Sequence, residues 1–277
     1  MEGRLTSALQ KSNRNNWNSY FSLFFFLPPR AITNNFFFSS EENNRYRNFF
    51  DMSLPLLNST EVLIIYGGVC CLLYVEADGF HRETPFMNIM PMLSLTILAL
   101  TLRVKKTTKL FTSLTFLVFA LAVYLHSSKW RNNLQSVYGA FTIAHILYIL
   151  SFILSIRRLW FACAVMVIIY VSTFLHFCFV DLFWSIPILV LNLSLHFIVL
   201  AISLIAAGSI WYYGSDIKEN RQKDALLRFL GLLSFMACDS LLILDRFGSH
   251  INGFNYLCTA LFYIGQPLLF VANQQAF

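Results

Sequence analysis

The chain has 277 residues, of which 57% are hydrophobic and only 12% are charged, and its formal net charge is +6. Soluble globular domains carry about 25% charged residues, so this composition excludes a soluble globule, a coiled coil and a disordered chain. The sequence instead predicts an all-α membrane protein, whose architecture is set by the number of helices that cross the bilayer.

The first segment, residues 1–51, differs from the rest because it is rich in Asn, Ser and Arg and has no sustained hydrophobic period. Its apolar run, residues 20–27, ends at Pro28 and is too short to span a bilayer. We therefore predict a disordered polar leader over residues 1–51 and a transmembrane domain over residues 52–277. Met52 opens the membrane-like part, which leaves open that the leader is an extension of the gene model.

Charged side chains mark the ends of the predicted spans, because such groups avoid the hydrocarbon core. Cutting the sequence at its charges gives eight transmembrane helices of suitable length. They run over residues 57–75, 86–102, 110–126, 134–155, 159–179, 183–212, 225–244 and 254–272. The sixth is the least defined, because no charge occurs between Asp181 and Asp216. A single tilted helix is favoured there over one that is broken near Pro187.

Eight spans place both termini on one side of the membrane, and the basic residues indicate which side. Ten basic residues lie in or beside the loops on the side of the termini: Arg103, Lys105, Lys106, Lys109, Arg157, Arg158, Lys218, Arg221, Lys223 and Arg228. Four lie on the other side: Arg82, Lys129, Arg131 and Arg246. This asymmetry predicts cytosolic termini. The net positive charge is thereby explained by topology and anionic lipid headgroups, and it indicates no nucleic-acid partner.

Ionisable side chains at membrane depth are functional candidates, because their burial is expensive. Asp239 is the only carboxyl group that lies well inside a predicted span. Three histidines, His145, His176 and His196, lie at comparable depth. An isolated histidine inside a membrane is usually a neutral packing residue, and this is our interpretation of His176 and His196.

Two stripes of polar residues single out the fourth and the last spans. Residues three or four apart share one helical face. In the fourth span these are Thr142, His145 and Tyr148, and in the last span they are Tyr256, Thr259, Tyr263 and Gln266. Pro267 then frees a backbone carbonyl that a polar cavity could satisfy. We predict a central polar cavity formed by the fourth, seventh and eighth spans; the alternative is separate hydrogen bonds between helices without a cavity.

The residues of this predicted cavity also carry a family resemblance. Residues 139–148, which contain His145 and Tyr148, look like the His-x-x-Tyr segment of the YhhN lysoplasmalogenase family. Residues 238–247 and then 262–266 resemble the Ser-Asp segment and the last Tyr-containing helix of that family. The resemblance covers roughly residues 84–275 and implies a small eight-span membrane hydrolase.

Two positions depart from the family pattern. Asn88, three residues before Pro91, stands where the family typically has Lys. Tyr124 follows Val123 at the place where the family has the Asp of a Gly-Asp pair. The family resemblance therefore leaves one expected carboxyl group missing.

The resemblance implies hydrolysis of the vinyl ether bond of lysoplasmalogens, which gives a fatty aldehyde and glycerophosphoethanolamine or glycerophosphocholine. It implies Asp239 and His145 as the catalytic residues, since burial favours the protonated form of a carboxyl group and the imidazole would position water or act as a base. The implied substrate-binding residues are Asn88, Tyr124, Tyr148, Tyr263 and Gln266.

The expected partners are the lysophospholipid substrate within the bilayer and other membrane lipids. We expect no cofactor and no metal ion, and we expect the endoplasmic reticulum membrane as the location. Because one family Asp is missing, the alternative is a lipid-binding or scaffolding relative that has lost catalysis.

Overall fold

The computed structural model describes residues 59–77, 85–101, 106–127, 134–156, 158–180, 182–214, 221–247 and 254–275. The predicted leader, residues 1–51, lies outside these ranges. So do many of the basic residues that predict the topology, namely Arg82, Arg103, Lys105, Lys129, Arg131, Arg157 and Lys218.

The described residues form eight α-helices and no strand. The helices are α4 Ser59–Glu76, α5 Pro85–Thr101, α6 Lys106–Ser127, α7 Leu134–Phe152, α8 Phe161–Phe179, α9 Pro187–Tyr213, α10 Arg221–Phe247 and α11 Phe254–Gln275, with a short 3₁₀ helix, η2 Ile153–Ser155, after α7. The sixth predicted span is a single helix, as favoured, but it begins at Pro187 and not at residue 183. The reason is that proline fits the first turn of a helix, where its missing N–H leaves no bond unmade.

Six of these helices are long and apolar enough to cross a membrane: α6, α7 with η2, α8, α9, α10 and α11. Helix α5 is also apolar but has only 17 residues. Many large apolar side chains point outward from the bundle. On α8 only 11% of the most apolar stretch of 18 residues is buried. Such an apolar exterior fits an integral membrane protein. The crossing of the bilayer by α4 and α5 stays a prediction.

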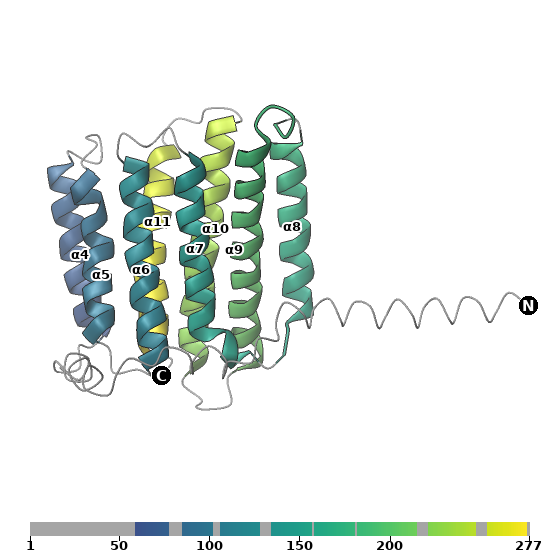
Figure 1. Ribbon diagram of the computed structural model, residues 1–277. Coiled ribbons are helices and arrows are strands. Elements are labelled where there is room, and N and C mark those ends of the chain that lie inside the picture. Colours follow the sequence, from purple (N-terminus) through teal and green to yellow (C-terminus); the bar gives the residue numbers. More distant parts are fainter. Residues whose placement is uncertain are drawn as a thin grey trace, which may run out of the picture. The chain divides into compact units, whose positions relative to one another are not determined.

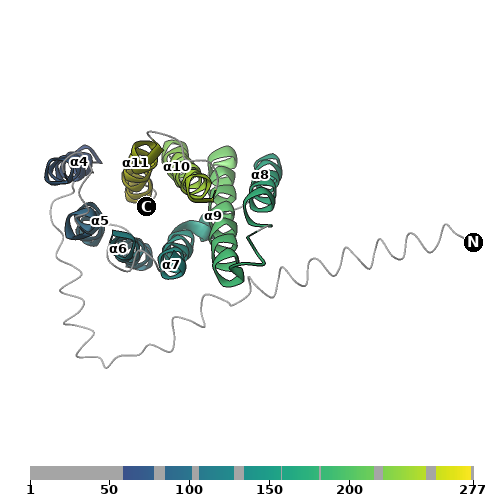
Figure 2. The same cartoon turned by 90° about the horizontal axis from the view of Figure 1, so that it is seen from above.

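Seven of the helices form a closed ring, and the eighth lies outside it. The order around the ring is α4, α5, α6, α7, α9, α10 and α11, and α11 packs back on α4 (Figure 2). Helix α8 packs on the outer side of α9 and makes smaller contacts with α10. Successive helices alternate in direction, so the C-terminus, η2 and the start of α10 lie at the same end of the bundle (Figure 1).

The ring closes through a backbone carbonyl that a proline sets free. Pro267 lies inside α11 and has no N–H, so the carbonyl of Tyr263, four residues earlier, loses its helical partner. The hydroxyl of Tyr66 on α4 donates a 2.9 Å hydrogen bond to this oxygen. The expected freed carbonyl is thus satisfied by a neighbouring helix.

A buried polar cluster lies near the C-terminal end of the chain. The guanidinium of Arg228 on α10 donates to the carbonyl of Ala272 at 3.2 Å and to the side chain of Asn273 at 3.0 Å. Asn273 in turn donates to the hydroxyls of Thr112 and Ser151. These bonds hold the last turn of α11 against α6, α7 and α10, so we assign this cluster a structural role.

Helices α10 and α11 approach each other closely because glycines face each other across the contact. A methyl group added at Gly265 would lie 3.0 Å from the ring of Phe235 and 3.3 Å from the carbonyl oxygen of Gly231. We therefore expect Gly265→Ala to be less stable than Gly67→Ala, where a methyl group meets nothing within 4 Å. Both variants gain helix propensity, so the difference, about 1–3 kcal/mol, isolates the steric clash. Denaturant titration in mixed micelles measures it, and equal stabilities would contradict the close contact.

Candidate active site

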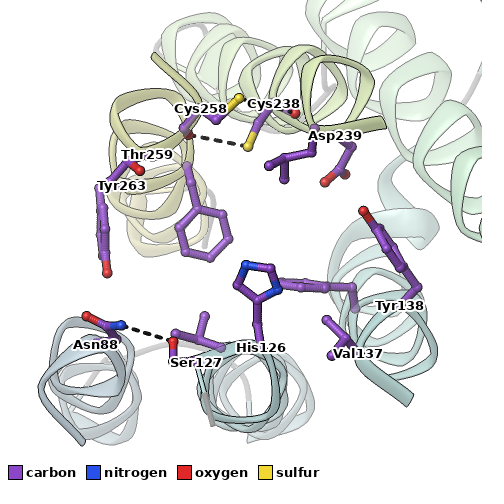
Figure 3. A pocket seen from close by; sticks show the side chains of 14 residues that line it. Asn88, His126, Ser127, Val137, Tyr138, Cys238, Asp239, Cys258, Thr259 and Tyr263 are labelled. Carbon is purple, nitrogen blue, oxygen red and sulfur yellow. Dashed lines mark hydrogen bonds between the residues drawn. The ribbon is translucent and has the colours of Figure 1, made fainter. Parts of the chain in front are cut away.

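A cavity of about 230 Å³ lies between five helices at the end of the bundle away from the C-terminus (Figure 3). Its lining comes from the first turns of α5, α7 and α11 and the last turns of α6 and α10. The lining residues are Asn88, Val123, His126, Ser127, Val137, Tyr138, Phe141, Cys238, Asp239, Leu242, Cys258, Thr259, Phe262 and Tyr263. The fourth, seventh and eighth spans do enclose a cavity as predicted, with α5 and α6 as additional walls, but it lies toward one end of the bundle, its lining is mainly apolar and His145 does not belong to it.

Asp239 is the carboxyl group of this lining, and its side chain faces the cavity (Figure 3). The residue is only 8% exposed. Its Oδ2 lies 2.9 Å from Nε2 of His196 on α9, which is fully buried behind it. In Figure 3 the hydroxyl of Tyr138 also points toward the Asp239 carboxyl group. A buried acid is thus held at the cavity wall by an imidazole.

The orientation of the His196 ring is fixed by Thr142. The Thr142 hydroxyl donates to the carbonyl of Tyr138 at 2.7 Å, so its oxygen is left to accept from Nδ1 of His196, 3.3 Å away. We infer that Nδ1 carries a proton and that Nε2 faces Asp239. A hydrogen bond between Nε2 of His196 and Oδ2 of Asp239 then requires one proton between these two atoms.

His145, the histidine expected beside Asp239, lies one turn deeper in α7 than the cavity residue Phe141. Its ring is fully buried and contacts the edges of Phe119 and Phe235, with centroid distances of 5.2 and 5.3 Å. The His196 ring is its other neighbour, at 5.4 Å. Neither nitrogen of His145 has a hydrogen-bond partner among the described residues. Its predicted catalytic role stays a prediction, because the imidazole that bonds Asp239 is that of His196.

The predicted substrate-binding residues fall into two groups. Asn88 and Tyr263 line the cavity, and the Asn88 amide donates to the Ser127 hydroxyl at 3.0 Å (Figure 3). The other three do not belong to the lining: Tyr124, Tyr148 and Gln266.

These three side chains lie outside the lining for different reasons. The ring of Tyr124 packs against Phe86 at 5.9 Å, and the Tyr148 hydroxyl donates to the carbonyl of Leu269 at 3.1 Å. Gln266 is fully buried, and its side-chain amide has no hydrogen-bond partner. Their substrate-binding role stays a prediction that this cavity does not support.

The interpretation of His196 as a packing residue missed its contact with Asp239. A signal was present in the sequence, since Asn192 and His196 lie one turn apart and form a short polar stripe of the kind that singled out His145. Asn192 also faces α7, because its amide donates to the carbonyl of Gln135 at 2.6 Å.

A comparison with models of protein families shows to which family the chain belongs. The model of the YhhN family matches residues 84–273, well over half of the chain. The chain belongs to the YhhN family. No curated protein and no solved structure matches it in the corresponding searches.

In this YhhN-family chain the matched residues include every helix that lines the cavity. The cavity offers one buried acid, an imidazole behind it and further polar groups in its lining, among them Asn88, Ser127 and Thr259. Its other walls are mainly apolar and aromatic. Such a site suits an amphiphilic ligand that needs proton transfer at one end.

Proposed function

We propose that this protein hydrolyses the vinyl ether bond of lysoplasmalogens and releases a fatty aldehyde and a glycerophospho-alcohol. The observation that carries the proposal is the buried Asp239–His196 pair, with an Oδ2–Nε2 distance of 2.9 Å, in the wall of a cavity inside an apolar helical bundle. Cleavage of a vinyl ether begins with a proton added to its β-carbon. This proton would come from the Asp239–His196 pair, whose carboxyl group lines the cavity.

The remaining steps need a stabilised cation and a water molecule. Protonation of the β-carbon leaves an oxocarbenium ion, which the Asp239 carboxylate would stabilise once it has given up its proton. Water then adds to the cationic carbon, and the resulting hemiacetal breaks down to the aldehyde and the free glycerol hydroxyl. Asp239 acts first as acid and then as counter-ion, the two roles that other hydrolases divide between two carboxyl groups.

The mainly apolar walls of the cavity suit a lipid, whereas its volume suits only part of one. A volume of about 230 Å³ is below the ≈ 300–1,000 Å³ of sites that enclose a whole ligand. We propose that it takes the reacting end of the lipid, while the chain lies along the apolar exterior of the bundle. Cytosolic termini and a location in the endoplasmic reticulum membrane are part of the same proposal.

Aldehyde release from defined lysolipids tests the proposal. Purified protein in micelles is offered a lysoplasmalogen, and the matched lysolipids with an acyl or a saturated alkyl chain serve as controls. We expect aldehyde from the vinyl ether alone, because only its β-carbon can accept the proton. Absence of aldehyde from every lysoplasmalogen tested would refute the enzymatic proposal.

If the substrate lies in the cavity, filling the cavity with a large side chain should lower the activity. Thr259 is a small residue of the lining, so Thr259→Trp should fill the space and lower kcat/KM for lysoplasmalogen by at least about tenfold. Thr173→Trp, at an exposed position on α8, is the matched control and should retain activity. Initial rates of aldehyde release measure both. Full activity in Thr259→Trp would place the substrate elsewhere.

One observation favours a second function. The cavity lining contains a single carboxyl group, and Tyr124, at the position of the missing family Asp, packs against Phe86 outside it. A lipid-binding relative that lacks catalysis would have this composition. It is distinguished by lysolipid binding that persists in a protein that releases no aldehyde.

A further inference from the structure

Three potential metal ligands gather behind the cavity wall. They are His145 from α7, His196 from α9 and Asp239 from α10, and all three are buried. One ligand atom from each lies within 4.8 Å of those of the other two. In a tetrahedral zinc site with bonds of 2.0–2.1 Å the ligand atoms lie about 3.3 Å apart, so small side-chain rotations would bring these three onto one ion.

We propose that His145, His196 and Asp239 bind a divalent transition-metal ion of the zinc type. His145 provides the first reason. Both of its nitrogens are buried and have no hydrogen-bond partner in the part of the chain that the structure describes, although buried polar groups in proteins are almost always bonded. A metal ion at His196 and Asp239 would give one of these nitrogens a partner.

The second reason is the contact between His196 and Thr142. Histidines that bind metals usually donate their other ring N–H to a fixed oxygen, which sets the tautomer and the ring orientation. Here Nδ1 of His196 points to the Thr142 oxygen at 3.3 Å, and Nε2 faces Asp239 and the cluster. The ring is therefore held ready for a metal ion at Nε2.

The third reason is the position of Asp239 in the cavity lining. Two histidines and one carboxylate, with an open fourth position, form a common type of catalytic zinc site. Because Asp239 lines the cavity and both histidines lie behind it, the open position would face the cavity and the substrate.

The chemical role of the ion rests on the proposed function, whereas its binding does not. A bound ion displaces the proton shared by Asp239 and His196, and Asp239 becomes a ligand. The acid is then water at the open position, since a metal ion makes bound water more acidic. This water would give its proton to the β-carbon and its hydroxide to the carbon next to the ether oxygen. The product is the same hemiacetal, with no change in oxidation state.

Metal analysis of the full chain tests the binding. The protein is purified in detergent without chelators and without a polyhistidine tag, and its metal content is measured by mass spectrometry. The protein is then stripped and titrated with Co²⁺, whose visible absorption reports nitrogen and oxygen ligands in a tetrahedral site. We expect about one ion per chain in both measurements. Absence of both a co-purified ion and saturable Co²⁺ uptake would overturn the proposal.

Variants connect the ion to these residues. His145→Leu and His196→Ala should lose stoichiometric binding, and Thr142→Val should weaken affinity about 10- to 100-fold. His176→Ala, an exposed histidine on α8, is the matched control and should bind as the parent does. A folded His145→Leu protein with unchanged Co²⁺ affinity would remove His145 from the site.

The two proposals fail separately. Stoichiometric metal binding without aldehyde release would leave the metal site and refute the hydrolase. Full aldehyde release by chelator-stripped, metal-free protein would leave the hydrolase and refute the catalytic ion.

Discussion

Replacing Asp239 with asparagine is expected to reduce aldehyde release from lysoplasmalogen by about 10²–10⁴-fold, the usual contribution of a general acid. The amide has the shape of the carboxyl group and can still bond His196, so the helices should pack unchanged. It cannot transfer a proton to carbon, and it carries no negative charge to stabilise an oxocarbenium ion. As a poor metal ligand it would also lower the occupancy of the proposed ion.

The matched control for this prediction is Asp245→Asn on the same helix. Asp245 lies near the end of α10 and is absent from the cavity lining. This variant should therefore keep the parental rate. An Asp239→Asn protein with normal turnover in the aldehyde assay would eliminate Asp239 as the acid and, with it, the mechanism proposed for this cavity.

The second large effect concerns stability and separates the two buried histidines. His196→Ala leaves the Asp239 carboxyl group in the bundle without its 2.9 Å partner, and breaking a buried pair in this way costs about 3–5 kcal/mol. His145→Leu removes no hydrogen bond within the chain and keeps a similar volume between Phe119 and Phe235. We expect it to cost less than about 1.5 kcal/mol.

Both free energies of unfolding are measured by denaturant titration in mixed micelles, with a chelator present so that a metal ion contributes nothing. His176→Ala on the exposed face of α8 serves as the control and should change the free energy of unfolding by less than about 0.5 kcal/mol. A larger loss in His145→Leu than in His196→Ala would mean that His145, and not His196, is the partner on which Asp239 depends.

The helices themselves were predictable from the positions of the charged residues. Every predicted span coincides with a helix in the described part of the chain, and the largest differences at a start occur at α6, α9 and α10, which begin at Lys106, Pro187 and Arg221 and not at residues 110, 183 and 225. The reason is local. A long apolar segment inside a membrane has no water to bond its backbone N–H and C=O groups, and a helix satisfies all of them within the segment itself. The polar stripe likewise indicated which face of α7 turns inward. On α11 it did so for Thr259, Tyr263 and Gln266 but not for Tyr256, which is 53% exposed.

The partner of Asp239 was not predictable in the same way. His145 and His196 both have apolar neighbours in the sequence and lie at similar depth, and His145 was preferred because it has polar residues three positions away on either side. The choice depends on which helices are adjacent and how each is rotated about its axis. Those two quantities come from packing between helices that are distant in sequence.

By itself, then, the sequence determined the helical class, the eight helices of the described residues, the family and the position of Asp239 inside a helix, because charge spacing and polar periodicity are properties of each helix alone. The tertiary structure decided that α7, α9 and α10 meet around Asp239 and that α8 stays outside the ring. It also decided that His196 bonds the acid while both nitrogens of His145 lack a partner. The physical reason is that the sequence of one apolar helix surface is compatible with several neighbouring helices. Close packing of the eight described helices selects one arrangement among them.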